Sequence, residues 1–175
     1  MPIFQKSKNS TRGLSIVETI VYIGLLSILL LSVVSSILTM GTAVASIKSA
    51  RSISTNATNA LERMIREIRE MDTVDPTNSI LDTNPGTLIL IATSTSGATS
   101  SLRFFLSGTT LMIVSTTASA QMLTGRDVDV TNLVFRRIAT STIQAVKIEM
   151  TVQSKNGKNI RHKNYYSTTV LRGSY

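Results

Sequence analysis

A run of 29 consecutive residues without a charged side chain, Thr19–Ile47, constrains this chain more than any other feature of its sequence. It is longer than the roughly 20 apolar residues that a helix needs to cross a bilayer. No proline interrupts the run, and the glycines at Gly24 and Gly41 are tolerated in helices that lie in a membrane. The run therefore predicts a membrane-spanning helix near the start of the chain.

One acidic residue, Glu18, stands directly before the uncharged run. A charge on a lipid-exposed helix costs about 2.5 kcal/mol or more toward the bilayer centre, so an acid in this place usually has a partner or a task. Two interpretations are open from the residues alone. Glu18 has a partner during function, or it occupies the first turn of the helix, where the helix dipole favours a carboxylate.

The helical pattern continues past the uncharged run, and we expect one helix from Leu14 to about Met71. Small and hydroxyl residues recur in the second half of the run, and such residues let helices approach each other closely in a membrane. From Ala57 on, apolar residues recur at steps of three and four, which marks a single helical stripe. These residues are Ala57, Ala60, Leu61, Met64, Ile65, Ile68 and Met71. The last turns therefore suit packing against a folded head.

Strand patterns dominate after the helix. A connector, residues 72–86, carries turn signals at Asp75-Pro76 and Asn84-Pro85-Gly86. The alternation of Val146, Ile148, Met150 and Val152 with polar residues predicts a strand with one buried face. The expected strands are 87–93, 102–106, 111–114, 128–135, 145–152 and 164–171, with turns at 107–110 and at Asn156-Gly157 and a loop at 115–120. The sequence predicts an α+β fold, in which the long helix packs its C-terminal half on an antiparallel β-sheet head.

The composition excludes several kinds of site. The chain has no cysteine, so it cannot form disulfides or use thiolates. Its net charge of +8 suits anionic lipid or nucleic acid, but the basic residues are scattered. The sequence has no phosphate-binding glycine loop, zinc-ligand spacing or nucleophile elbow. We therefore expect that the chain is not an enzyme, and that it has no catalytic residue, cofactor or metal.

Five aspartates are a second candidate site. Asp127 and Asp129 stand two positions apart, so they would share one face of a strand. With Asp72, Asp75 and Asp82 they could supply the oxygen ligands that calcium prefers. Their spacing matches no known calcium loop, and we favour the interpretation that they are solvated surface acids.

The segment Arg161-His162-Lys163-Asn164-Tyr165-Tyr166 combines basic charge with adjacent aromatic rings. Such a combination can hold single-stranded nucleic acid. We favour a charged edge strand instead, because charge on an edge discourages aggregation. His162 has no cysteine or second histidine with which to bind a metal, because it is the single histidine of the chain.

Residues 1–13 form a short basic leader that ends in glycine. Together with this leader, Gly13-Leu14-Ser15-Ile16-Val17-Glu18 and the apolar run resemble the signal of type IV prepilins, which type IV pilins share with type II secretion pseudopilins. The resemblance implies cleavage after Gly13 by a membrane prepilin peptidase and N-methylation of Leu14. Glu18 matches the acid at the fifth place after the cut, which in the family pairs with the free amino terminus of a neighbouring subunit during assembly.

Other stretches resemble particular members of that family. Residues 61–69 resemble the L-x-R-x-x-R-x-I-R stretch of J-type minor pseudopilins and W-type minor pilins, and residues 130–135 and 168–172 resemble later strands of the same proteins. The resemblance implies a pilin-like head and a minor or tip subunit. Two departures are Leu14, where Phe or Met is commoner, and the absence of the helix proline found in many major subunits.

The resemblance implies a filament subunit with a leader at 1–13, a transmembrane and assembly helix at 14–48, the amphipathic half of that helix at 49–72 and a β-rich head at 73–175. Lys6, Lys8 and Arg12 would hold the N-terminus in the cytoplasm, with the head outside the cytoplasmic membrane and later in an extracytoplasmic filament. The implied partners are the prepilin peptidase and N-methyltransferase, other subunits, an inner-membrane assembly platform and the bilayer. The alternative is a single-pass membrane-anchored binding domain that joins no filament.

Overall fold

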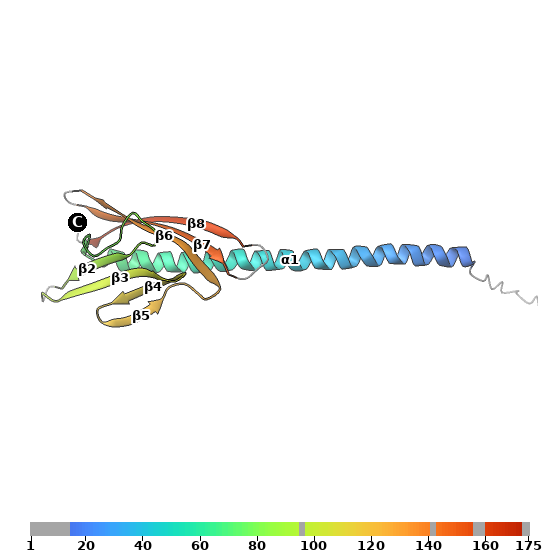
Figure 1. Cartoon of the computed structure of the whole chain (residues 1–175), viewed down its shortest axis with the longest axis horizontal. Helices are drawn as coiled ribbons and strands as arrows, with labels where there is room; N and C mark the ends of the chain where they lie inside the picture. Colours follow the sequence, from blue (N-terminus) through green and yellow to red (C-terminus); the bar gives the residue numbers. More distant parts are fainter. Residues whose placement is uncertain (1–14, 95–96, 141–142, 156–159, 173–175) are drawn as a thin grey trace, which may run out of the picture. The chain divides into compact units, whose positions relative to one another are not determined.

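The computed structural model describes residues 15–94, 97–140, 143–155 and 160–172. The chain divides into two compact units, Met1–Val44 and Ala45–Tyr175, and we call the second unit the head. One helix precedes the strands (Figure 1). The elements are α1 (Ile16–Arg69), β1 (Thr73–Val74), β2 (Leu88–Thr93), β3 (Thr99–Ser107), β4 (Thr110–Ser115), β5 (Ala118–Met122), β6 (Val128–Ala139), β7 (Gln144–Ser154) and β8 (His162–Val170).

Helix α1 contains 54 residues and confirms the long helix predicted from the sequence. Its first turn holds the acidic Glu18, and its last turn holds the basic Arg66 and Arg69. Each charge therefore lies at the helix end that the dipole favours. The helix closes with a tighter turn, because the amides of Glu70 and Met71 donate to carbonyls three residues earlier.

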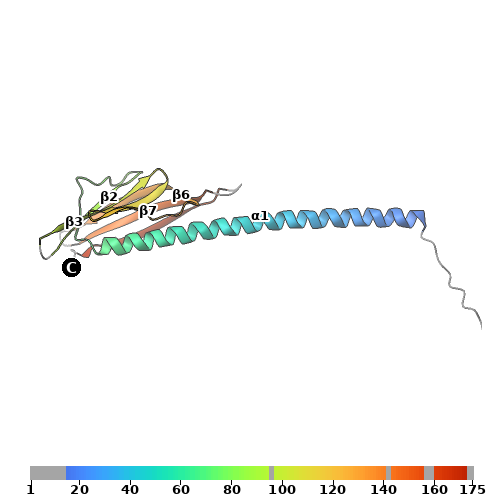
Figure 2. The ribbon, with the colours of Figure 1, turned by 90° about the horizontal axis from the view of Figure 1, so that it is seen from below.

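Two antiparallel sheets form the β part of the head, where we expected one. The first has the strand order β1-β2-β3-β4-β5 and the second the order β6-β7-β8. Figure 2 shows both sheets on the same side of the C-terminal part of α1. The α+β class is confirmed. The split into two sheets arises because the chain between β5 and β6, residues 123–127, leaves one sheet and starts the next.

Most predicted strands are confirmed, but the loop expected at 115–120 is wrong. Residues Ala118–Met122 form β5, an edge strand that pairs with β4 through Ser115↔Ala118 and Met112↔Met122. All five of its residues are exposed, so it has no alternating burial for a sequence pattern to reveal. Gly108 turns the chain between β3 and β4 with a φ of 63°, a conformation that glycine adopts without strain. The turn predicted at Asn156-Gly157 lies outside the described residues.

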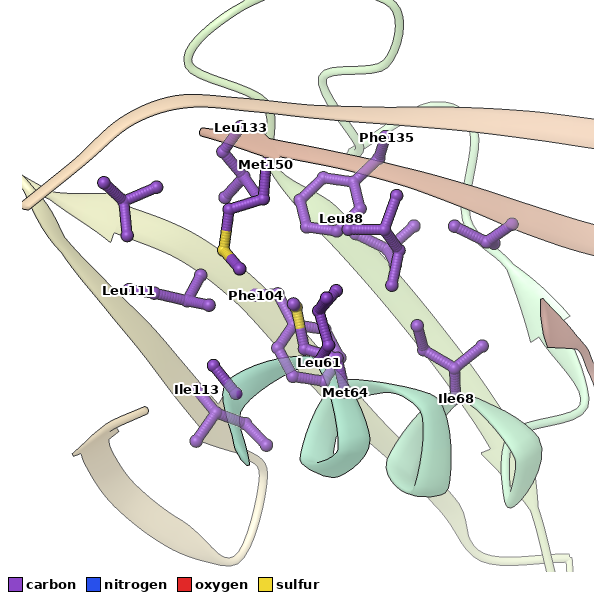
Figure 3. Packing of buried hydrophobic residues seen from close by; sticks show 14 of the residues in the cluster. Leu61, Met64, Ile68, Leu88, Phe104, Leu111, Ile113, Leu133, Phe135 and Met150 are labelled. Atoms are coloured by element: carbon purple, nitrogen blue, oxygen red, sulfur yellow. The ribbon is translucent and has the colours of Figure 1, made fainter. Parts of the chain in front are cut away.

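The core of the head lies between α1 and the two sheets (Figure 3). Leu61, Met64 and Ile68 from the helix face Phe104 of the first sheet and Phe135 of the second. Met64, Ile68 and both phenylalanines are 0% exposed. Full burial of such a side chain stabilises the fold by about 1.5–3 kcal/mol. The amphipathic stripe predicted from Ala57 onward is therefore the surface through which the helix holds the head together.

Candidate assembly helix

The N-terminal part of α1 exposes its apolar side chains on every side. Tyr22, Leu31 and Ile47 are 58%, 72% and 68% exposed, whereas Ile53 is 2% exposed. The helix is long and apolar enough to cross a membrane. A helix that is apolar all round needs lipid or other helices around it. The surface that this part of α1 offers is thus suited to a bilayer or to a bundle of helices.

Three hydroxyl groups in this segment bond to carbonyls of their own helix. Ser27 Oγ donates to the carbonyl of Ile23 at 2.8 Å, and Thr39 Oγ1 donates to the carbonyl of Ser35 at 2.9 Å. Thr42 Oγ1 donates to the Thr39 carbonyl at 2.8 Å. An unpaired hydroxyl is costly in an apolar medium, and these bonds remove that cost. The segment can therefore enter lipid without leaving these three side chains unsatisfied.

Glu18 is the third residue of α1 and is exposed. Ser15 precedes the helix, and its carbonyl accepts the amide of Thr19 at 3.1 Å. Ser15 and Glu18 have the spacing of a capping box, in which the acid would reach back to the amide of the cap residue. Within the described residues no hydrogen bond or ion pair to the Glu18 side chain is found. Gly13 and Leu14, the predicted cleavage and methylation site, lie outside the described residues.

A polar cluster that the sequence did not predict joins α1 to the loop between β5 and β6. Asn56 Oδ1 accepts the amide of Gly125 at 2.8 Å, and Asn56 Nδ2 lies 3.5 Å from Asp127 Oδ1. Ser52 Oγ donates to the other carboxylate oxygen of Asp127. We call Ser52, Asn56, Gly125 and Asp127 the polar latch. Ser52 and Asn56 stand next to the buried Ile53 and Ala57 on the helix. Polar residues beside a buried stripe are the sequence signal from which this cluster could have been predicted.

The other candidate aspartates also have partners in the protein. Asp129 Oδ1 accepts from Thr109 Oγ1 at 2.6 Å, and Asp72 Oδ2 accepts the amide of Thr93 at 2.7 Å. Asp82 pairs with an arginine, and Asp75 accepts three bonds from residues 77 and 78. In the part of the chain that the structure describes, no three acidic or histidine side chains gather into a metal site. Asp72, Asp75, Asp127 and Asp129 are half-buried and bonded within the protein, so the expectation of fully solvated surface acids is wrong for these four, whereas Asp82 is exposed.

The hydrogen bonds of Asp75 and of Glu149 change the acidity of both groups. The side chain of Asn78 is the main cause of the lowered pKa of Asp75, and backbone amides add to it. The pKa of Glu149 is lowered by its bond to Lys147 at 2.9 Å and then by its bond to Arg136 at 3.0 Å. Arg136, Lys147 and Glu149 form a charged surface cluster on β6 and β7.

The basic and aromatic segment starts at Arg161 and continues into β8, which is one of the two edge strands of its sheet. Lys163 Nζ lies 5.3 Å from the ring centre of Tyr165, and Lys147 Nζ lies 5.9 Å from that of Tyr166. Tyr165 packs partly buried against the core, whereas Tyr166 is 63% exposed. The two rings are on opposite faces of the strand, so they cannot form one stacking platform for successive bases.

Glu18 and the exposed apolar side chains thus lie on the same helix, α1. The five aspartates all belong to the head, where Asp127 bonds to Ser52 of α1. Comparisons with known protein families, with curated proteins and with solved structures find no match to this chain.

Proposed function

We propose that this chain is a structural subunit of a type IV pilus-like or type II secretion filament. It is cleaved after Gly13, N-methylated on Leu14 and assembled through its N-terminal helix. Before assembly the helix spans the cytoplasmic membrane, with the N-terminus in the cytoplasm and the head outside. The resemblance of residues 61–69 to J-type and W-type proteins supports a minor or tip position.

The observation that carries this proposal is the contrast in burial along α1. Leu31 and Ile47 are more than half exposed, whereas Met64 and Ile68 are 0% exposed. A single-pass anchor needs about 20 apolar residues, and the uncharged run of 29 residues exceeds that length. The run also has small residues at Ser32, Ser35 and Ser36, which permit close helix contacts. Such a surface suits a helix that first lies in lipid and later packs in a bundle of helices.

Glu18 supplies the electrostatic part of the mechanism. A carboxylate in an apolar bundle is costly unless an opposite charge is close. Cleavage after Gly13 creates an amino group at Leu14, and that cation can pair with Glu18 of a neighbouring subunit. Because the uncleaved chain lacks this amine, only processed subunits gain the ion pair. Extraction from the membrane then replaces lipid contacts with contacts between helices.

The intact mass of the chain isolated from cells with an active prepilin peptidase tests this proposal. Removal of residues 1–13 lowers the mass by about 1.5 kDa, and one N-terminal methyl group adds about 14 Da. We expect a mature chain that starts at Leu14. A chain that retains Met1–Gly13 in such cells would instead support the membrane-anchored binding domain, and replacement of Gly13 by a larger residue should reproduce that retained mass.

A further inference from the structure

Basic side chains gather at one end of the head, around the point where α1 leaves its uncharged run. The run ends at Ile47, and Lys48 and Arg51 follow on the exposed side of the helix. Arg126, Lys155 and Arg161 come from the loop before β6 and from both sides of the β7–β8 connection, and all three are exposed. We call these five residues the basic collar.

Backbone and side-chain bonds hold the parts of the collar together. Ser52 donates to the carboxylate of Asp127, which places Arg126 beside the helix. The carbonyl of Asp127 accepts the amide of Lys155 at 3.0 Å, and the carbonyl of Arg161 accepts the amide of Ser154 at 3.0 Å. These bonds link Arg161 and Lys155, through Ser154 and Asp127, to Ser52 on the helix.

The collar lies close to the place where the membrane surface would be. Ser52 is four residues from Lys48, which is about 6 Å along a helix. Lys48 is the first charged residue after the uncharged run. If the run spans a bilayer, the collar therefore lies at the level of the lipid head groups.

Two acids accompany the collar, and both are engaged within the protein. Asp127 accepts from Ser52, and Asn56 lies 3.5 Å from its second oxygen. Asp129 accepts from Thr109 and lies 3.9 Å from Lys155 Nζ. The charge that this end presents to the outside is therefore positive. Ile160, 67% exposed, adds an apolar side chain next to Arg161.

We propose that the basic collar binds anionic phospholipid head groups and holds the head against the membrane surface before assembly. Basic residues near an anionic leaflet are attracted to it, and the attraction falls off within a Debye length. An adjacent exposed isoleucine suits the boundary between head groups and acyl chains. This inference needs the helix to span a bilayer, as in the proposed function, but it does not need the chain to enter a filament.

The full chain reconstituted in vesicles provides the test. Because the protein has no cysteine, an Ile160→Cys substitution gives one site for a polarity-sensitive fluorophore. Ile143→Cys is the matched control, since Ile143 is also exposed but precedes β7 at its opposite end, about 35 Å away. Phosphatidylcholine vesicles are compared with vesicles that contain roughly a third phosphatidylglycerol.

We expect the fluorescence emission of the probe at position 160 to shift to the blue in anionic vesicles and to be quenched by lipids that carry a nitroxide on the head group. Both effects should disappear at about 1 M NaCl, where the Debye length is about 3 Å. The probe at position 143 should not respond. The same probe signal at position 160 in neutral and anionic vesicles would overturn the proposal, and this comparison needs no variant of the collar.

Charge variants distinguish the effect of the basic collar on the probe from the effect of the net charge of the head. Arg126→Gln, Lys155→Gln and Arg161→Gln combined should abolish the response at position 160. Arg66→Gln, Arg103→Gln and Arg137→Gln remove the same charge elsewhere and should preserve it, with thermal unfolding in detergent as the check that both heads are folded. Equal responses from the two folded variants would contradict the assignment. A response of the solubilised chain to a single-stranded oligonucleotide, without any response to anionic vesicles, would overturn it in favour of nucleic acid.

Discussion

At the scale of single residues, the polar latch depends on the lack of a side chain at Gly125. A Cβ atom there would lie 2.6 Å from Asp127 Oδ1 and 2.8 Å from Asn56 Oδ1. Both distances are shorter than carbon–oxygen contacts in proteins allow, and both oxygens already accept or approach donors in the latch. Either the loop or the side chains of Asn56 and Asp127 must therefore shift if this glycine is replaced.

We predict that Gly125→Ala lowers the free energy of unfolding of the head by about 1–3 kcal/mol, because the bond from the Gly125 amide to Asn56 is lost and both half-buried partners are left unsatisfied. Thermal unfolding of the full chain in detergent measures the effect. Gly41→Ala is the control, since a Cβ atom there meets nothing within 4 Å. Equal melting temperatures for the two variants would show that the latch does not stabilise the head.

The cluster around Glu149 predicts a dependence of stability on pH. Its pKa in the folded head is lower than the ordinary value of 4.5, so the folded state binds fewer protons than the unfolded state below about pH 4.5. The stabilisation from Glu149 is therefore complete above that pH and is lost as the pH falls through the folded-state pKa. We expect Glu149→Gln to flatten the fall in melting temperature as the pH is lowered below about 4.5. An unchanged slope would contradict the role of the cluster.

The sequence revealed Glu18 but not the latch. Glu18 stands out because the next 29 residues carry no charge. Asn56 and Gly125 are 69 positions apart, and a pairing between a helix and a distant loop has no local signal. The sequence signal for the latch is that Ser52 and Asn56 stand beside the apolar residues Ile53 and Ala57. Polar groups close to a buried stripe need hydrogen-bond partners.

At the scale of elements, α1 has two surfaces with different requirements, and two methionines can compare them. Met64 is 0% exposed and faces Phe104 in the core, whereas Met40 is 69% exposed. We predict that Met64→Ala lowers the free energy of unfolding of the head by about 2–5 kcal/mol, because the core is left with a cavity.

The matched variant Met40→Ala should change that free energy by less than about 0.5 kcal/mol. Denaturant or thermal unfolding in detergent, followed through a signal of the β strands, measures both variants. Similar losses of head stability in the two variants would contradict the division of α1 into a free surface and a core surface.

The strands show what a pattern can and cannot predict. β7 was predicted because the apolar Val146, Ile148 and Met150 alternate with polar residues, and these three side chains are buried in the structure. β5 was missed because all of its residues are exposed, so backbone pairing with β4 alone defines it. The two-sheet arrangement likewise depends on long-range pairing, which alternation within a strand does not specify.

At the scale of the whole molecule, the two units have different tasks in the proposed function. The head folds around the buried stripe of α1, whereas the N-terminal unit has exposed apolar side chains that, in the proposed function, contact lipid and then helices of other subunits. The proposed assembly depends on an ion pair between Glu18 and the new amino terminus of a neighbouring subunit. Removal of one partner from a buried ion pair costs about 3–5 kcal/mol, more than a hundredfold in an association constant.

The most direct measurement is the amount of this chain in sheared extracellular filaments from cells that carry a prepilin peptidase and an assembly system. We predict that Glu18→Ala inserts in the membrane and is cleaved to begin at Leu14, but is absent from the filaments. Glu62→Ala, at an exposed glutamate of the same helix, should enter them at the wild-type level. Recovery of cleaved Glu18→Ala chains in filaments at the wild-type level would contradict the account.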